Sequence, residues 1–305
     1  MDQFEVHILG CGSALPTARH NSSSQIVRIG NELLMIDCGE GTQLQIRKAH
    51  QHFSRINHVF ISHLHGDHCF GLIGMISTFG LLGRATPLHI YAHKMLRTLL
   101  TPQLDYFCKG MKYEVVLHDI DPEKQEVIFE NKTISVETLP LDHRIPCCGF
   151  LISEKPKKRH INPQMADFYK IPNYARPLLR EGEDYITPDG ERIANERLTT
   201  PPDPSRSYAY CSDTKPCQQI IEKIKGIDLL YHEATFANKE RARALETFHS
   251  TAEQAAEIAK EADVKKLLIG HFSSRYDNEQ QLLDEARAIF PATELAAENR
   301  TFKIL

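Results

Sequence analysis

Three histidines and an aspartate, His63, His65, Asp67 and His68, lie within six residues in the segment "ISHLHGDHCF". The apolar run "INHVFI" comes directly before them and is typical of a buried strand. Imidazole nitrogens and carboxylate oxygens are the usual ligands of a catalytic divalent metal, above all zinc. Four donors in one short loop are too many for a single open tetrahedral site. The spacing therefore predicts two neighbouring metals, which can stabilise both the attacking and the leaving oxygen of a displacement.

Two metals need further ligands, and the chain offers them in similar places. His143 follows the strand-like "ISVETLPL", Asp213 follows "SYAYC", and His271 follows "KKLLIG". Asp37 lies in "LLMIDCGEG", where glycines let the backbone turn sharply. A lone histidine or aspartate after a strand is more often an ordinary turn residue. Together with the first cluster, these four predict a ligand set that converges at one edge of a sheet.

The order of elements predicts a layered mixed α/β architecture. The first half is rich in expected strands, at 4–10, 24–30, 32–39, 58–62, 87–92, 113–120, 126–130, 134–141 and 148–153, with helices expected at 41–50, 69–83 and 95–104. The second half alternates, with strands expected at 207–213, 227–233 and 265–271 and helices at 218–225, 251–262 and 282–290.

The stretch from about 153 to 206 differs in composition. Prolines and charges are dense, and apolar periodicity is missing. Residues 155–180 carry seven Lys or Arg against one acid, whereas 181–205 carry seven acids against two arginines. One interpretation is a long solvated excursion. The other is an arm with a basic face that binds an anionic polymer.

The overall composition excludes few functional classes of protein. The 305 residues include 41% hydrophobic and 25% charged residues, and the formal net charge is −4, so the whole-molecule field would not attract nucleic acid. The N-terminus shows no signal peptide, and the uncharged run 69–83 is too short for a membrane span. Eight cysteines without a CxxC pair predict free thiols and a cytoplasmic location.

The pattern HxHxDH, with a preceding strand aspartate and a later His, Asp and His, resembles the metallo-β-lactamase fold. Within that superfamily the chain resembles ribonuclease Z, the tRNA 3′-processing endoribonuclease, in its short form. The resemblance runs from about residue 8 to 276 and is carried by these segments: "LGCGSALPTARHNSSS", "FGLLGRATPLHIY", "YHEATF", "HSTAEQAAEIA" and "GHFSSRY".

The resemblance implies a single domain over 1–305, a four-layer αββα sandwich, with an arm inserted at about 153–206. It implies two Zn²⁺ ions per subunit, although Mn²⁺ or another divalent metal also suits such ligands. One ion would take His63, His65 and His143, and the other Asp67, His68 and His271, with Asp213 as the bridge. Asp37 would orient the ligands, and Asp67 would also hold the nucleophilic water.

The resemblance also gives the leaving group an acid, His249, oriented by Glu233. The alternative interpretation of His249 is a histidine that flanks a helix start. Ser250 and Glu253 could form a capping box, which explains part of the motif without chemistry but does not require His249.

In ribonuclease Z the arm binds the tRNA elbow, and the family is a homodimer in which one subunit's arm presents tRNA to the other's site. The arm residues expected to contact phosphates are Lys155, Lys157, Lys158 and Arg159. The chain departs from the family in two places. The arm lacks the frequent Gly-Pro pair, and the early loop "PTARHN" has Ala18 and His20 where basic residues are frequent; that loop helps discriminate mature CCA ends in the family.

The expected function is a cytoplasmic zinc endoribonuclease that cuts tRNA precursors 3′ of the discriminator base, with no membrane partner. An alternative keeps the metals and hydrolyses small or cyclic phosphodiesters, which do not need an arm. A third is a nucleic-acid-binding scaffold with structural metal only. Structural zinc sites are usually closed and cysteine-rich, unlike this one, so it ranks last.

Overall fold

The computed structural model describes residues 3–305. They form two compact units. The first comprises residues up to 130, 135–152 and 206–305, and the second comprises 131–134 and 153–205. Among the described residues, no helix is long and apolar enough to cross a membrane.

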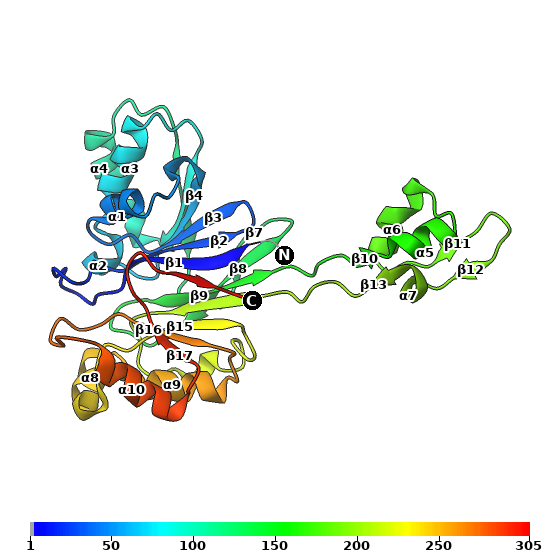
Figure 1. Cartoon of the computed structure of the whole chain (residues 1–305). Helices are drawn as coiled ribbons and strands as arrows, with labels where there is room; N and C mark the ends of the chain where they lie inside the picture. Colours follow the sequence, from blue (N-terminus) through cyan, green and yellow to red (C-terminus); the bar gives the residue numbers. More distant parts are fainter. Residues whose placement is uncertain (1–2) are drawn as a thin grey trace. The chain divides into compact units, whose positions relative to one another are not determined.

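Two seven-stranded sheets form the centre of the first unit (Figure 1). In spatial order, the first sheet contains β18 (Thr301–Lys303), β1 (Phe4–Gly10), β2 (Ser24–Ile29), β3 (Glu32–Ile36), β4 (Ile56–Phe60), β5 (Leu88–His93) and β6 (Val115–Ile120). The second contains β17 (Thr293–Leu295), β16 (Leu267–Gly270), β15 (Leu229–Glu233), β14 (Ser207–Cys211), β9 (Cys148–Glu154), β8 (Ile134–Pro140) and β7 (Val127–Glu130).

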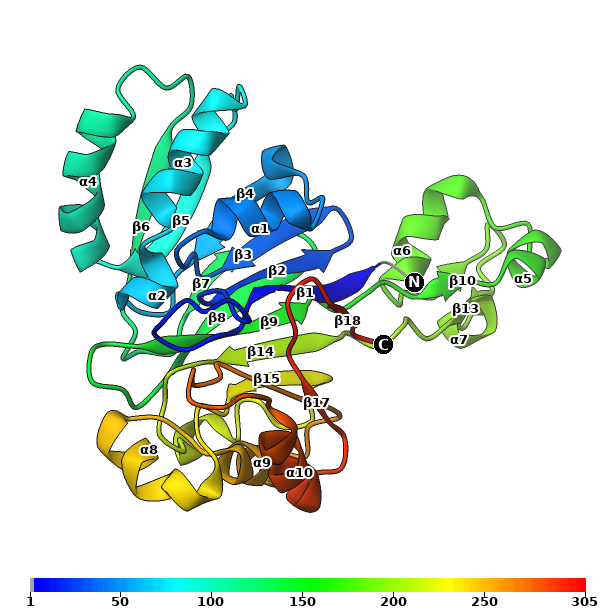
Figure 2. The ribbon, with the colours of Figure 1, turned by 60° about the vertical axis from the view of Figure 1, so that its left-hand side comes forward.

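Helices cover the outer face of each sheet, which gives the four layers αββα (Figures 1 and 2). The first sheet carries α1 (Thr42–Lys48), α3 (Leu72–Leu81) and α4 (Met95–Phe107), and the second carries α8 (Arg241–Thr247), α9 (Ala252–Glu261) and α10 (Gln280–Ile289). Shorter turns are α2 (Gly66–Cys69), η1 (Phe53–Arg55), η3 (Gln218–Ile220) and η4 (Asn238–Glu240).

The inner faces of the sheets meet through large buried side chains. The ring centroids of Phe60 and Phe150, one from each sheet, are 5.7 Å apart. The hydroxyls of Tyr208 and Tyr210, on β14, donate hydrogen bonds to Gln25 and Asp37 of the first sheet. A buried hydroxyl needs a partner, so these two bonds stabilise one alignment of the sheets.

Parallel strands place the ligand-bearing loops together. Strands β3 to β6 are parallel to their neighbours, as are β14 to β17. The carboxyl ends of parallel strands lie at the same edge of a sheet, where ligands of α/β proteins usually bind. Residues that follow β3, β4, β14 and β16 therefore meet at one edge of the sandwich.

The second unit is a small folded body with its own core. It contains β10 (His160–Ile161), β13 (Thr199–Thr200), β11 (Tyr185–Ile186) and β12 (Arg192–Ile193), with α5 (Pro163–Phe168), η2 (Asn173–Ala175), α6 (Arg176–Arg180) and α7 (Asn195–Leu198). The buried residues are Ala166, Ile171, Ala175, Leu179, Tyr185, Ile193 and Leu198. The core is small, and its residues are widely spaced along the chain. The sequence of this stretch therefore shows no apolar periodicity.

Three local expectations from the sequence differ from the structure. The helix expected at 218–225 is only the 3-10 turn η3, after which Ile224 is fully buried and Gly226 reverses the chain at φ 69°. Helix α8 was not expected. The capping box at the start of α9 is formed by Thr251 and Gln254, one residue later than predicted.

Candidate active site

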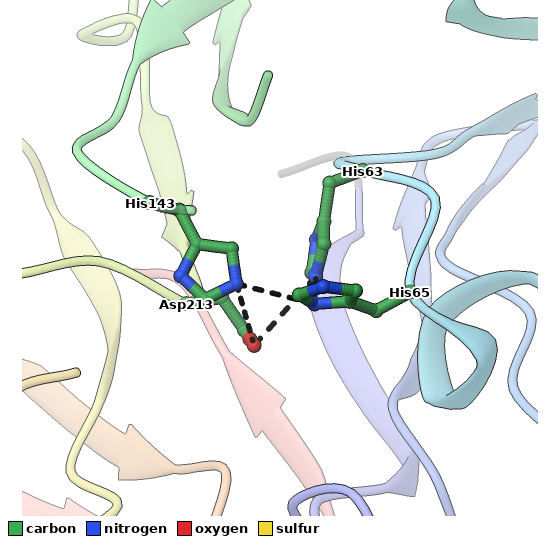
Figure 3. A group of neighbouring side chains, drawn as sticks. All are labelled: His63, His65, His143 and Asp213. Atoms are coloured by element: carbon green, nitrogen blue, oxygen red, sulfur yellow. Dashed lines mark hydrogen bonds and ion pairs between the residues drawn. The ribbon is translucent and has the colours of Figure 1, made fainter. Parts of the chain in front are cut away.

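His63, His65, His143 and Asp213 form the first group of side chains that could hold a metal ion (Figure 3). One ligand atom from each lies within 4.8 Å of the others. His63 Nε2 is 3.0 Å from His65 Nδ1, which is 3.2 Å from His143 Nε2. Two of these residues follow β4, one follows β8 and one follows β14, so both sheets contribute.

Asp67, His68 and His271 form the second group, and Asp213 lies between the two. Asp213 Oδ1 is 3.1 Å from Nε2 of both His68 and His271. Its other oxygen, Oδ2, is 3.6 Å from His63 Nε2 and 3.9 Å from His143 Nε2. Each oxygen thus faces a different group, which is the geometry that a bridging carboxylate needs.

The spacing and burial of these donors fit divalent metal ions. Two nitrogens on one tetrahedral zinc with bonds of 2.0–2.1 Å lie about 3.3 Å apart. The observed separations of 3.0 and 3.2 Å within the first group are close to that value. Nε2 of His68 and of His271 is buried and faces the Asp67 and Asp213 carboxylates without a well-formed hydrogen bond, an arrangement that a cation between imidazole and carboxylate would satisfy. The ligand set therefore fits a metal centre better than a hydrogen-bonded cluster.

Asp37 holds the ligand loop from beneath. Its carboxylate accepts hydrogen bonds from the Ser62 amide (2.8 Å) and hydroxyl (2.9 Å), from His68 Nδ1 (2.7 Å) and from the Tyr210 hydroxyl (2.7 Å). The bond to Nδ1 leaves Nε2 of His68 for a metal and increases the basicity of the ring. Asp37 thus contacts His68 on the ring nitrogen that the resemblance leaves free of metal.

Several site residues have left-handed backbone conformations. Asp37, Asp213 and His271 have φ values of 56°, 53° and 59° at the ends of β3, β14 and β16, and Phe248, before His249, has φ 62°. Residues other than glycine rarely adopt these angles, and such strain is typical of functional sites. At Asp37, Asp213 and His271 the chain leaves the extended conformation of its strand at or just before the site residue.

His249 and Glu233 form a hydrogen-bonded pair beside the ligands. His249 Nδ1 lies 2.8 Å from Glu233 Oε1, and the buried carboxylate also accepts bonds from the Thr214 and Ser250 amides and the Thr235 hydroxyl. Burial by itself lowers the pKa of His249, but the Glu233 carboxylate outweighs it and raises that pKa to about 9. His249 Nε2 is not used by Glu233 and can act on a substrate.

A cavity of about 550 Å³ gives access to the two groups. His65, Asp67, His143, Asp213 and His249 line it, with Ser13, Ala14 and Pro16 of the early loop and Ser22, Phe70 and Arg144. The Ala14 amide donates a hydrogen bond to Asp67 Oδ2 (2.8 Å), so the early loop contacts a predicted ligand directly.

Sequence reasoning missed the residues that orient the ligands through short contacts. Thr235 Oγ1 lies 3.0 Å from His271 Nδ1, and the Phe248 carbonyl lies 3.1 Å from His143 Nδ1. Ser62 and Tyr210 contact Asp37 as described above. Ser62 and Thr235 lie next to recognised motif residues, and that adjacency was the available signal. Phe248 also lies next to a recognised residue, His249, but its contact is made by a backbone carbonyl, which the residue type does not reveal.

The predicted arm residues are largely paired within the second unit. Lys157 bonds Glu154 (2.8 Å), Lys158 bonds Glu181 (2.5 Å), and Arg159 Nε donates to Thr199 Oγ1 (2.7 Å). The Lys155 amide donates a hydrogen bond to the Thr133 carbonyl, and Lys155 has at least one other interaction partner. These contacts reduce the positive charge that the four residues offer to a partner.

Two family models match parts of the chain: "Anti-Pycsar protein Apyc1" over 4–161 and "Beta-lactamase superfamily domain" over 191–272. Ribonuclease Z of Phocaeicola vulgatus is 60% identical over 304 residues, covering 100% of this chain and 98% of its own. The chain belongs to the ribonuclease Z family.

Other comparisons agree with this family. Ribonuclease Z of Bacteroides fragilis strain YCH46 is 58% identical over 299 residues, which is 98% of either chain. The crystal structure of human tRNase Z, short form, is 25% identical with a TM-score of 0.72 and covers 99% of both chains. The metallo-β-lactamase fold and the short-form family membership expected from the sequence are thereby confirmed. Together with the His/Asp clusters, the fold indicates dependence on divalent metal.

Proposed function

We propose that the protein is an endoribonuclease that removes the 3′ trailer from tRNA precursors. Hydrolysis leaves a 3′-hydroxyl on the tRNA and a 5′-phosphate on the trailer. The observation that carries the proposal is the pair of ligand groups bridged by Asp213, in a chain 60% identical to a ribonuclease Z along its whole length.

Two Zn²⁺ ions are the proposed cofactors, with Mn²⁺ as a possible substitute. His63, His65 and His143 would hold one ion and Asp67, His68 and His271 the other, with Asp213 shared. When bound, such ions supply positive charge for a phosphate oxygen and lower the pKa of water. The donor set supports zinc because imidazole and carboxylate suit it, but also suits other divalent metals.

The chain's own residues handle the protons. Asp67 lines the cavity and can accept a hydrogen bond from the attacking water. His249, charged because of Glu233, can donate its Nε2 proton to the ribose 3′ oxygen as the P–O bond breaks. The Glu233 carboxylate stays ionised, since burial would raise its pKa but His249 outweighs burial and lowers it.

The second unit is the proposed tRNA-binding arm. Lys170, Arg176 and Arg180 are exposed and can contact phosphates. Phe168 and Tyr174 are also exposed, by 74% and 76%, and can contact nucleobases or sugars. The charge pairing of Lys157 and Lys158 supports a larger role for these residues than for the four basic residues predicted from the sequence.

A homodimer is the proposed assembly. Apolar side chains are exposed on the contacting helices α3 and α4, among them Leu81 (86%), Leu82 (59%), Tyr106 (80%) and Phe107 (65%). Light scattering is expected to give about twice the chain mass of 34.8 kDa. Tyr106→Glu with Leu81→Glu should give a monomer, whereas Leu245→Glu on α8, at a 61% exposed position, should not. A monomer before any substitution would contradict this proposal.

The cytoplasm is the proposed location. Its support is that all eight cysteines of the chain are free and that seven of them are buried.

Hydrolysis of small or cyclic phosphodiesters is a second candidate. The seven proposed ligands all lie in the first unit and none in the arm, which favours it, because a small substrate does not need the arm. The same site would act, and the difference would lie in what the chain binds outside the cavity.

The deciding experiment is cleavage of a precursor tRNA with a 3′ trailer and no encoded CCA, with and without chelator. One chelator-sensitive cut after the discriminator base is expected, and Asp67→Ala or His65→Ala in folded protein should abolish it. No cut, with a small chromogenic phosphodiester still hydrolysed, would favour the second candidate.

A further inference from the structure

Four titratable side chains form a second cluster away from the proposed metal ligands: Cys11, His20, Glu279 and Glu298. His20 Nδ1 lies 3.2 Å from Glu298 Oε2, and its Nε2 lies 3.0 Å from Glu279 Oε1. A neutral imidazole has one N–H and can donate to only one carboxylate. Two carboxylates on opposite ring nitrogens therefore favour the doubly protonated imidazolium.

The cluster suits a proton better than a metal ion. The Cys11 thiol lies 3.6 Å from His20 Nδ1 and is fully buried. Burial, and then Glu298, raise its pKa well above the ordinary value, which opposes the thiolate that a metal would need. The charged groups that face the ring are thus Glu279 and Glu298, with Arg19 also bonded to Glu279 (3.3 Å).

The cluster anchors the early loop, residues 13–21, to the C-terminal part of the chain. The Asn21 amide donates to Glu298 Oε1 (2.9 Å), and the Arg19 guanidinium donates to the carbonyls of Tyr276 and Asp277. Within the loop, the Thr17 amide donates to the His20 carbonyl (2.9 Å). His20 thus joins a closed turn to two acidic side chains that lie more than 250 residues away in the sequence.

The same loop forms part of the cavity wall. Ala14 has φ 55°, and this strained backbone directs its amide to Asp67 Oδ2 (2.8 Å). Ser13, Ala14 and Pro16 line the cavity. Movement of the loop would therefore shift both a contact of Asp67 and the surface that a substrate meets.

We propose that His20 is a positioning residue whose imidazolium, held between Glu279 and Glu298, fixes the early loop against the active site for RNA binding. The proposal rests on the proposed function. Loss of the His20 proton leaves two carboxylates beside a neutral ring that can satisfy only one of them. The loop then loses one of its anchors, and the affinity for the RNA around the cut falls.

The direction of the pH effect follows from the same contacts. The hydrogen bond to Glu298 raises the pKa of His20 above 6.5, burial opposes this, and Glu279 adds to the rise. The charged form is thus favoured in the folded protein. Its contribution is complete below pH 6.5 and is lost as the pH rises through the raised pKa.

The test compares His20→Arg and His20→Gln in the full-length, metal-loaded protein. Arginine stays charged at every pH in the assay, whereas glutamine is always neutral. KM for precursor tRNA should rise with pH in the unaltered protein, stay level in His20→Arg, and be about tenfold higher at low pH in His20→Gln. All other groups titrate alike in the three proteins, so the pH dependence that the unaltered protein shows beyond that of His20→Arg is assigned to the His20 proton.

A milder variant protects the test against misfolding. Glu279→Gln removes one carboxylate and should move the midpoint of the KM profile to lower pH while the loop stays attached through Glu298. Parallel profiles for the unaltered protein and His20→Gln would overturn the proposal, as would an unshifted midpoint in Glu279→Gln. Failure of the proposed function would look different: no tRNA cleavage at any pH, with a small phosphodiester still hydrolysed.

Discussion

His249 keeps Nε2 available because Glu233 binds Nδ1. If the imidazolium protonates the leaving 3′ oxygen, His249→Ala should lower kcat on precursor tRNA by about 10²–10⁴-fold. A chromogenic phosphodiester has a leaving group that needs no proton, so its hydrolysis should fall far less. Steady-state rates on both substrates, with the zinc content of each protein measured, check this. Equal losses on both would assign His249 to metal binding instead.

The ionisation of His249 predicts a descending limb at high pH in the profile of kcat for tRNA cleavage. The pKa of His249 is raised to about 9, so the acid form is present at neutral pH and is lost as the pH rises through that value. The kcat of tRNA cleavage should fall above about pH 9, and the residual activity of His249→Ala should lack this limb. A fall at the same pH in the variant would place the titrating group elsewhere.

Substitutions of Tyr210 and Tyr208 form a matched pair that tests how Asp37 supports a proposed metal ligand. Tyr210→Phe removes one hydrogen bond from Asp37 and should lower stability by about 1–3 kcal/mol and weaken zinc binding by about 10–100-fold. Tyr208→Phe removes the hydrogen bond to Gln25. This bond reaches neither Asp37 nor a proposed metal ligand, so only the stability should change. Denaturant unfolding and zinc titration measure both. Equal zinc affinities of the Tyr210→Phe and Tyr208→Phe proteins would contradict the role given to Asp37.

At the scale of elements, the ligands were predictable because chemistry and strand ends coincide in the sequence. Asp37, Asp213 and His271 each follow an apolar run, and the structure brings them together where parallel strands end. The core of the second unit was not predictable, because its short elements join residues such as Ala166 and Leu198 that share no period. The turn at 218–225 was mistaken for a helix because Ile220 and Ile224 have helical spacing but are buried by a 3-10 turn and loop.

The second unit is inserted between neighbouring strands, which makes its removal a fair test. It leaves the first unit after β9 and returns at β14, and these strands are adjacent in the sheet. A short Gly-Ser linker in place of 155–204 can therefore close the gap without breaking the sandwich. Cleavage of tRNA should be lost and hydrolysis of a small phosphodiester retained. Loss of both activities in a protein with unchanged thermal stability would indicate that the unit serves the active site rather than tRNA binding.

At the scale of the whole sandwich, the ligand groups join its two sheets. His63, His65, Asp67 and His68 follow strand β4 of the first sheet, whereas His143, Asp213 and His271 follow strands of the second. Each group contains residues from both sheets. Metal binding to folded protein would therefore connect the sheets at the edge where both carry strained backbone, and the free energy of binding adds to the stability of the fold.

Zinc should raise the melting temperature for this reason. At free zinc about 100 times Kd, one site adds about 2.7 kcal/mol, which corresponds to about 4 °C for a chain of this size. Asp213→Asn removes the charge shared by both groups and should abolish most of the shift. Glu298→Gln, which changes a half-buried carboxylate outside both groups, should keep the shift. Melting curves of chelated and zinc-loaded protein measure the shift, and an equal shift in Asp213→Asn would show that the stabilising zinc binds elsewhere.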